Sequence, residues 1–385
     1  MKKEYWLGIV IMFILAFWAI PVLAETTETV DLAEEIDLSQ FKGFLDQVDR
    51  DTQQTLPSLS LSNIFEGLKS GSIELSVQDI LQQIFSAAIK EFLKNIPLVS
   101  KLLVLAILCA VINQLQTTFT GEVSKLSKLL TYFVLAGMAL VSFQSAISIG
   151  ISAIDRMVSF MQAVLPVMYT ILLAMGNITS GALFKPLVMG SLVFLATIVK
   201  SIVLPLFLVS AVLRVFNHIS GQFKLSKLAG LLEFGGKTAI GFIMTVFLGV
   251  MTIQGATGGV ADSVTLRTAK YSADLVPVVG KYFKDAVELV ASSGLILKSA
   301  VGIIALLAII LYTLSPIIQI IAMIITFKLS AALVEPLGEQ ELAESLQDIA
   351  KGLLQICITV AAVSVMFFIT LSIIIGVGDL TVMLR

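Results

Sequence analysis

The hydrophobic positions between Asn95 and Gly378 form a series of long, almost uncharged runs. Because a helix needs roughly 20 apolar residues to cross the hydrocarbon core of a bilayer, runs of this length predict membrane-spanning helices. A water-soluble fold would leave so much apolar surface without a place to bury it. The runs are Leu102–Phe119, Leu129–Ile154, Leu187–Leu213, Ile240–Val260, Leu295–Phe327 and Leu353–Val377.

The composition agrees with this pattern, since 57% of the residues are hydrophobic and only 14% are charged. We therefore predict an all-α fold, that of a polytopic helical membrane protein. The membrane domain is expected to occupy residues 97–385 with about six to eight apolar helical segments.

Residues 1–24 have the organisation of a secretory signal peptide. Two lysines form a basic start, Leu7–Ile20 is a short apolar stretch, and small residues come at its end. This pattern predicts cleavage after Ala24. The alternative is an uncleaved first membrane helix.

Residues 25–96 are acidic, with 13 acidic and 5 basic side chains, which is compatible with export. Within them, apolar residues from Val77 to Leu93 recur at helical spacing until Pro97. The apolar face predicts docking on a partner or on the outer membrane surface, and packing on the protein's own bundle is the alternative. The candidate docking residues are Ile80, Leu81, Ile84, Phe85 and Ala88.

The membrane part contains signs of an internal repeat. Pairs of proline or glycine residues recur at a spacing of 111 positions: Pro166 and Pro277, Pro205 and Pro316, and Gly241 and Gly352. We infer a duplication that maps residues 155–257 onto residues 266–368. Such repeats are common in membrane proteins that form a central pathway.

Leu187–Leu213 and Leu295–Phe327 are longer than one crossing requires, and each contains a proline. Each is either one long kinked span or a re-entrant helical hairpin. The basic segment Arg214–Lys237 favours hairpins, because basic loops prefer the cytoplasm. If the chain starts outside and every run crosses once, with Met157–Gly176 as a span, this segment falls outside. One hairpin, or a Met157–Gly176 that stays at the interface, removes the conflict.

Lys200 is the costliest polar residue in these runs, because a lysine at the centre of a membrane helix costs roughly 2.5–3.5 kcal/mol on insertion scales. It predicts a water-lined cavity or a buried partner such as Asp155 or Glu335; the alternative is a hairpin tip from which the side chain reaches the interface. The candidate pore positions are Lys200, Pro205, Pro316 and Gln319. The glutamines predict hydrogen bonds between helices; they are Gln144, Gln254, Gln319 and Gln355.

The residues offer no arrangement typical of catalysis, metal binding or nucleotide binding. One histidine and two cysteines are too few for a ligand cluster. Gly236-Lys237-Thr238 resembles the end of a phosphate-binding loop, but Leu231 stands where that motif requires glycine. We therefore predict no enzyme activity, no cofactor and no nucleic-acid partner.

Three stretches carry a family resemblance. They are Gly255–Gly280 (with Asp262, Arg267, Lys270 and Pro277-Val278-Val279-Gly280), Lys298–Gly302 and Glu335–Gly338. In these stretches, and over nearly its whole length, the chain resembles the bacterial stage III sporulation protein AE family.

The resemblance implies a role in endospore formation, in the mother-cell membrane that surrounds the engulfed forespore. It implies a membrane subunit of a channel or secretion-like complex that links the two cells and sustains late forespore gene expression. The implied partners, besides the lipid bilayer, are other proteins of the same operon, among them a cytoplasmic ATPase and intermembrane ring proteins. A scaffold that recruits the channel-forming partners is the alternative, and a stand-alone secondary transporter is another.

Overall fold

The structure, a computed structural model, is helical wherever it describes the chain, apart from short turns. It describes Gly43, Asp46, residues 48–50, and residues 77–115, 121–175, 178–219, 225–274 and 279–383. The predicted all-α fold is confirmed for these ranges. The predicted signal peptide, its cleavage site after Ala24 and most of the acidic segment 25–96 lie outside the described residues.

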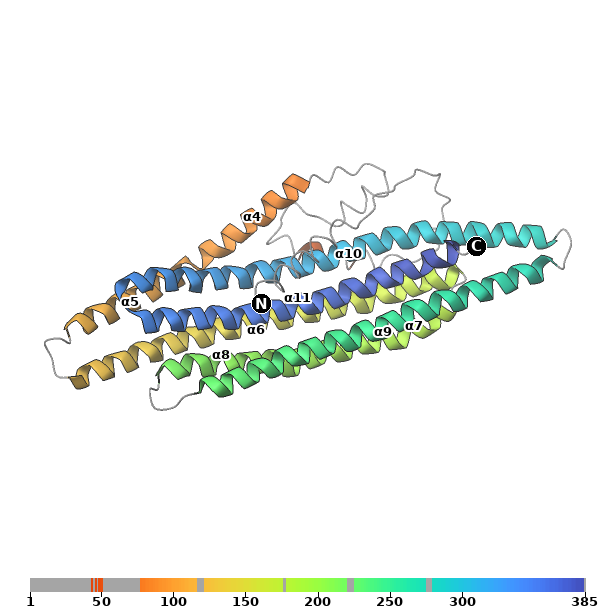
Figure 1. The fold of residues 1–385 in the computed structure, drawn as a ribbon. Coiled ribbons are helices and arrows are strands. Elements are labelled where there is room, and N and C mark those ends of the chain that lie inside the picture. Colours follow the sequence, from red (N-terminus) through yellow and green to blue (C-terminus); the bar gives the residue numbers. More distant parts are fainter. Residues whose placement is uncertain are drawn as a thin grey trace. The chain divides into compact units, whose positions relative to one another are not determined.

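The helices belong to one compact unit, Leu32–Arg385, and successive long helices run in opposite directions (Figure 1). In chain order they are α4 (Val77–Lys94), α5 (Ile96–Leu115), α6 (Gly121–Ala174), α7 (Ile178–Ile198), the π-helical turn η2 (Val199–Val203), α8 (Leu204–Ile219), α9 (Ser226–Asp274), α10 (Val279–Val334), the 3-10 turn η3 (Glu335–Leu337) and α11 (Gln340–Met383).

Several of these helices are long and apolar enough to cross a membrane. Within the residues that the structure describes, five stretches meet this condition: Leu130–Ala174, Leu187–Asn217, Ser226–Gln254, Lys298–Leu337 and Gln340–Gly376. A sixth is formed by α4 and α5 together, which meet at a bend of 42° around Asn95. The chain is therefore a multi-pass membrane protein, at the lower end of the expected number of spans.

The two segments that allowed either a kinked span or a hairpin are continuous helices. Leu187–Leu213 lies within α7, η2 and α8, which follow one another without a break, and Leu295–Phe327 lies within α10. The hairpin alternative is therefore wrong for both.

The assumption that Met157–Gly176 forms a separate segment is also wrong. Its residues up to Ala174 belong to α6, which also contains the whole of Leu129–Ile154 in one helix of 54 residues. Asp155 and Arg156, which interrupt the apolar pattern, lie inside this helix and do not end it.

The turn η2 explains how the first of these helices tolerates Pro205. A proline ring clashes with the carbonyl four residues earlier in a regular α-helix. In η2 the backbone N–H of Leu204 bonds to the carbonyl oxygen of Val199, five residues back. The wider turn relieves the crowding just before the proline, and the helix continues.

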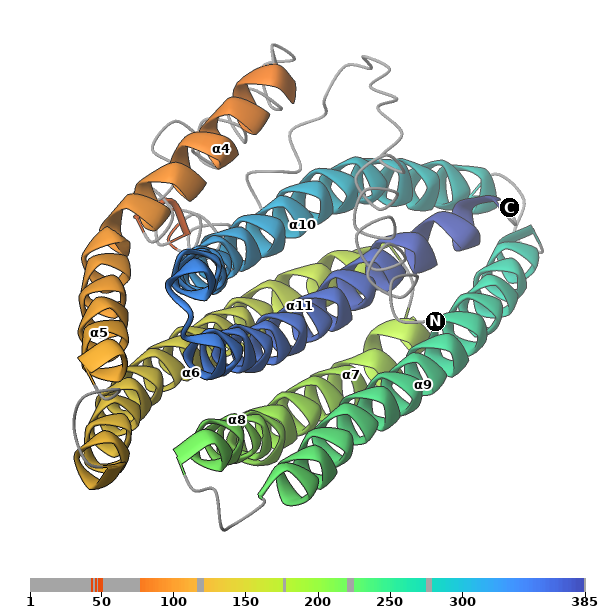
Figure 2. The same cartoon turned by 60° about the vertical axis from the view of Figure 1, so that its left-hand side comes forward.

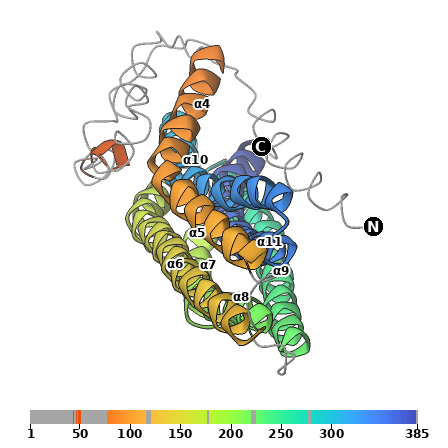
Figure 3. The ribbon, with the colours of Figure 1, turned by 90° about the vertical axis from the view of Figure 1, so that its left-hand side faces the viewer.

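Helices α6 and α11 lie between α10 and the group formed by α7, α8 and α9. Each of the two packs against both α8 and α10, and Figure 2 shows this arrangement. Seen along the helices in Figure 3, α5 lies beside α6 and α10, against which it packs. Helices α10 and α11 form the most extensive pair and are joined through Gly338, whose φ of 84° is strained for residues with a side chain.

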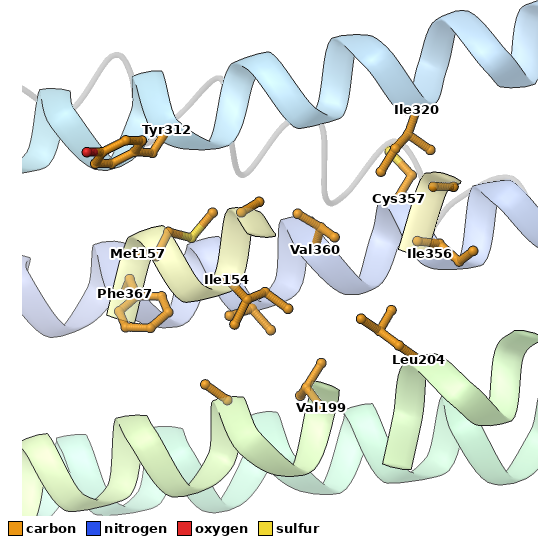
Figure 4. Packing of buried hydrophobic residues seen from close by; sticks show 14 of the residues in the cluster. Ile154, Met157, Val199, Leu204, Tyr312, Ile320, Ile356, Cys357, Val360 and Phe367 are labelled. Atoms are coloured by element: carbon orange, nitrogen blue, oxygen red, sulfur yellow. The ribbon is translucent and has the colours of Figure 1, made fainter. Parts of the chain in front are cut away.

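The core is apolar and centred on α11. Ile154 and Met157 of α6, Val199 and Leu204 of the α7–α8 helix, and Tyr312 of α10 gather around Val360 and Phe367 (Figure 4). One close approach depends on Gly352, where an added Cβ would lie 2.7 Å from the Cβ of Ala211 and 2.8 Å from Cε1 of Phe143. The missing side chain lets α11 contact α8 and α6 at one point.

Candidate functional site

An ion pair joins two candidate spans near their middle. Nζ of Lys200, in η2, donates a hydrogen bond to Oδ1 of Asp155, in α6. Of the two buried partners suggested for Lys200 by the sequence, Asp155 is the one that pairs with it, but its side chain is about half exposed and not buried. The alternative of a hairpin tip for Lys200 is wrong, because the lysine lies inside the continuous stretch Leu187–Asn217.

The ion pair lies at the surface of the chain and not in its core. The side chain of Lys200 is 24% exposed and that of Asp155 is 51% exposed. A charged group at this depth is stable where it faces water or other protein groups, and costly where it faces hydrocarbon. The surface of α6 around Asp155 is therefore unsuited to contact with lipid tails.

The π-helical turn ties Lys200 to Pro205. Lys200 is its second residue, and Pro205, which is exposed, is the second residue after its end. Such turns insert an extra residue into a helix and occur frequently at functional sites. Two of the four candidate pore positions thus belong to one local feature.

The other two candidates lie on a different helix. Pro316 is buried within α10, and Gln319 is half-buried, with Nε2 donating to Oγ of Ser315 at 3.4 Å in the same helix. Helices α6 and α11 lie between them and the α7–α8 helix (Figure 2). The structure therefore does not bring the four candidates into one site.

The most extended polar feature of the spans was missed from the sequence. Every exposed residue of α6 between positions 144 and 162 is polar: Gln144, Ser148, Ser152, Asp155, Ser159 and Gln162. They recur every three or four residues and so share one face, which we call the α6 polar stripe. It is about 27 Å long at 1.5 Å per residue, close to the roughly 30 Å of a bilayer's hydrocarbon core.

The predicted docking face of α4 is divided between two environments. Ile84 and Ala88 are half-buried and pack against the core, on the side where α4 contacts α10. Leu81 and Phe85 are 61% and 68% exposed, and Ile89 and Leu93 continue this exposed apolar edge. The side chain of Ile80 lies outside the described part of the chain. Packing on the protein's own bundle is thus confirmed for one edge, and the other remains open to a partner.

Charged residues connect α8 and α9 at the basic end of these helices. Arg214 and Lys237 both form ion pairs with Glu233. The neighbouring Gly236 lies against α8, since an added Cβ would be 2.6 Å from Cε1 of Phe207. Gly236-Lys237-Thr238 thus lies within a continuous packed helix and not in the strand–loop–helix context of a phosphate-binding loop.

The chemistry of the candidate site is that of polar side chains and one ion pair. Among the residues that the structure describes, no cluster of His, Cys, Asp and Glu could hold a metal ion. Cys109 and Cys357 are buried on different helices. The α6 polar stripe can hydrogen-bond to water, to a polar solute or to another protein segment.

Comparison with known proteins gives a consistent result. The sequence profile of the family described as Stage III sporulation protein AE matches residues 59–378. A curated protein of Bacillus subtilis (strain 168), named Stage III sporulation protein AE, is 32% identical over 366 residues, which are 94% of this chain and 92% of that protein. No solved structure shows significant similarity to the chain.

Proposed function

This chain belongs to the stage III sporulation protein AE family, and on that premise we propose that it is a membrane subunit of a channel or secretion-like complex linking mother cell and forespore. A role in sporulation follows from the family itself. In the proposed complex the chain lies in the mother-cell membrane around the forespore and supports late forespore gene expression. A cytoplasmic ATPase and intermembrane ring proteins of the same operon are its proposed partners.

The observation that best supports a channel subunit is the half-exposed Lys200–Asp155 pair. It lies near the middle of two stretches that are long and apolar enough to cross the membrane. A protein that only anchors others in lipid gains nothing from an exposed carboxylate at this depth, whereas a protein beside a water-filled path tolerates it.

A scaffold that recruits the channel-forming partners is the second candidate, and the exposed edge of α4 favours it. Leu81, Phe85, Ile89 and Leu93 form an apolar strip on a helix within the acidic segment 25–96, which is expected to be exported. Exposed apolar strips of this kind are typical sites for a partner helix.

We infer that the basic end of α8 and α9 lies in the cytoplasm. If the chain starts outside, the α4–α5 pair, α6 and the α7–α8 helix make three crossings and bring Arg214, Lys227 and Lys237 inside. Because α6 is one helix, this count agrees with the preference of basic residues for the cytoplasm without any hairpin.

A cysteine at Ser226, in a chain whose Cys109 and Cys357 are replaced by alanine, tests this orientation. In intact vegetative cells it is expected to resist a membrane-impermeant thiol reagent until the membrane is opened. A cysteine at Ser39, in the acidic segment that is expected to be exported, is the control and should react from outside. Reaction of the Ser226 cysteine in intact cells would contradict the orientation.

Replacing Leu81 and Phe85 together by serine tests the α4 edge. Each loses about 2 kcal/mol of apolar burial at an interface, so we expect binding of the operon partners to fall by at least about tenfold while the chain itself still folds. Copurification of partners and sporulation frequency are the measurements. Ile84→Ser is the contrasting variant: it packs on the core and should lower the amount of folded protein.

The same preparations separate a channel from a scaffold. Vesicles containing the chain with its partners are tested for release of a small polar dye. Release that persists from the chain alone, after the Leu81/Phe85 double variant has lost the partners, supports a channel subunit. Release that requires the partners and is lost with their recruitment supports a scaffold. Normal copurification and sporulation with the double variant would show that the exposed edge of α4 does not bind the operon partners.

A further inference from the structure

The exposed helix faces at mid-membrane depth differ sharply in polarity. On α9, the exposed residues near the middle of its span include Phe242, Val246 and Leu248, which suit hydrocarbon. On α6, every exposed residue from Gln144 to Gln162 is polar. The bundle thus has a face suited to lipid and a face that lipid does not solvate.

The α6 polar stripe lies level with the middle of the other spans. Its central Asp155 pairs with Lys200 of η2. Gly150 lies against Val360 of α11, since an added Cβ would be 3.0 Å from that side chain. Phe160 makes an edge-on ring contact with Tyr312 of α10, with centroids 5.8 Å apart. The polar residues are therefore not at a membrane surface, where they would need no explanation.

Among the described residues at this depth, buried hydroxyls such as those of Thr313 and Ser364 donate to carbonyl oxygens of their own helices. The space between α6, α10 and α11 is filled by buried apolar side chains (Figure 4). The gap between α6 and α8 has no room for a water molecule and is lined only by apolar residues, among them Leu140, Phe143 and Val212. Water that solvates the stripe must therefore lie outside the single chain.

We propose that the α6 polar stripe lines a water-filled path that is closed by further copies of this chain around a common axis. The inference rests on the proposed function and adds which face lines the path and what completes it. Rotational symmetry turns the same face of every copy toward the axis, so each copy supplies one strip of the wall.

The remaining part of the same face of α6 indicates that the protein packed against it is another copy of this chain. Toward the start of α6 the face continues through Val141, Gly137, Val134 and Leu130, which are exposed and, apart from the glycine, apolar. Copies that meet along this apolar part bury it and leave the polar parts around a water-filled space. Because Asp155 is neutralised by Lys200, the stripes of neighbouring copies carry no net charge that would drive them apart.

The chemistry of the stripe indicates which solutes pass. Serine hydroxyls and glutamine amides both donate and accept hydrogen bonds. Asp155, the one charged residue of the stripe, is paired with Lys200, and the neighbouring Arg156 is half-buried. The path therefore takes small hydrophilic solutes and hydrated ions of either sign. Lys200→Gln leaves the carboxylate of Asp155 unpaired beside the path, which makes the path prefer cations.

The test uses single cysteines in the full chain, assembled with its partners in membranes, with Cys109 and Cys357 replaced by alanine. Stripe cysteines at Ser148, Ser152 and Ser159 are compared with one at Thr245, a small polar residue exposed on the apolar face of α9. A water-soluble methanethiosulfonate is expected to modify the stripe cysteines at least about tenfold faster, because a thiol in hydrocarbon does not ionise.

Two further measurements complete the test. The mass of the chain in nanodiscs is expected to show several copies, and Lys200→Gln is expected to shift the reversal potential under a salt gradient toward that of the cation. Stripe cysteines that react as slowly as the Thr245 cysteine would overturn the inference, as would a single copy per particle or an unchanged reversal potential. If the cysteine reactivities, the copy number and the reversal potential all contradict the inference while sporulation and dye release remain normal, the proposed function stands and only the location of the path is wrong.

Discussion

Replacing Asp155 by asparagine is expected to destabilise the folded chain more than replacing Lys200 by glutamine. Lys200 is mostly enclosed by the protein, so without its partner it becomes an unpaired cation at mid-membrane, at a cost of roughly 2.5–3.5 kcal/mol. Asp155 is about half exposed, and beside water it tolerates the loss of Lys200 at a cost of about 1 kcal/mol or less, as for surface ion pairs.

Thermal unfolding in nanodiscs measures the difference, and sporulation frequency measures its effect on function. The double variant Asp155→Asn with Lys200→Gln has no unpaired charge and should recover most of the stability lost by Asp155→Asn. Lys200→Gln should fold but sporulate poorly, because it changes the charge beside the path. Equal destabilisation by the two single variants would show that Asp155 faces hydrocarbon.

Replacing Gly352 by leucine is expected to prevent accumulation of the folded chain. Even a Cβ at this position would lie closer than van der Waals contact to Ala211 and Phe143. A leucine forces α11 away from α6 and α8, and overpacking of this kind typically costs about 1–3 kcal/mol or more. Since α11 packs against most of the other helices, the loss should spread through the bundle.

Gly241 provides the matched control, because the inferred repeat pairs it with Gly352. Gly241 lies on α9, is exposed, and has no neighbouring atom within 4 Å of an added Cβ. Gly241→Leu should therefore leave the amount of folded protein in the membrane fraction unchanged or slightly raised, because leucine favours helix more than glycine does. Equal effects of the two leucines would mean that α11 does not approach α6 and α8 as described.

The long apolar runs were enough to predict the helices, because the bilayer requires length and low charge and both are local properties. The pairing of Lys200 with Asp155 could also be proposed, since few charges lie in the spans. The repeat of residues 155–257 in residues 266–368 stays a prediction.

The continuity of the helices could not be predicted. Asp155 and Arg156 between two apolar runs look the same in a sequence whether they lie in a loop or on a water-facing side of one helix. The same ambiguity concealed the α6 polar stripe: its serines and glutamines keep helical spacing, but the charged pair was read as a boundary. Only the contacts of α6 with α8, α10 and α11 decide between the two.

The π-helical turn at Val199–Val203 has a consequence for how the gene can change. The turn holds one residue more than a regular α-helical turn, so deleting a residue between Val199 and Val203 would restore a regular α-helix and leave α7 and α8 in register. Pro205 would then crowd the carbonyl oxygen four residues earlier. The length of this segment is therefore tied to the proline, and a shorter segment is expected only in a chain that lacks Pro205.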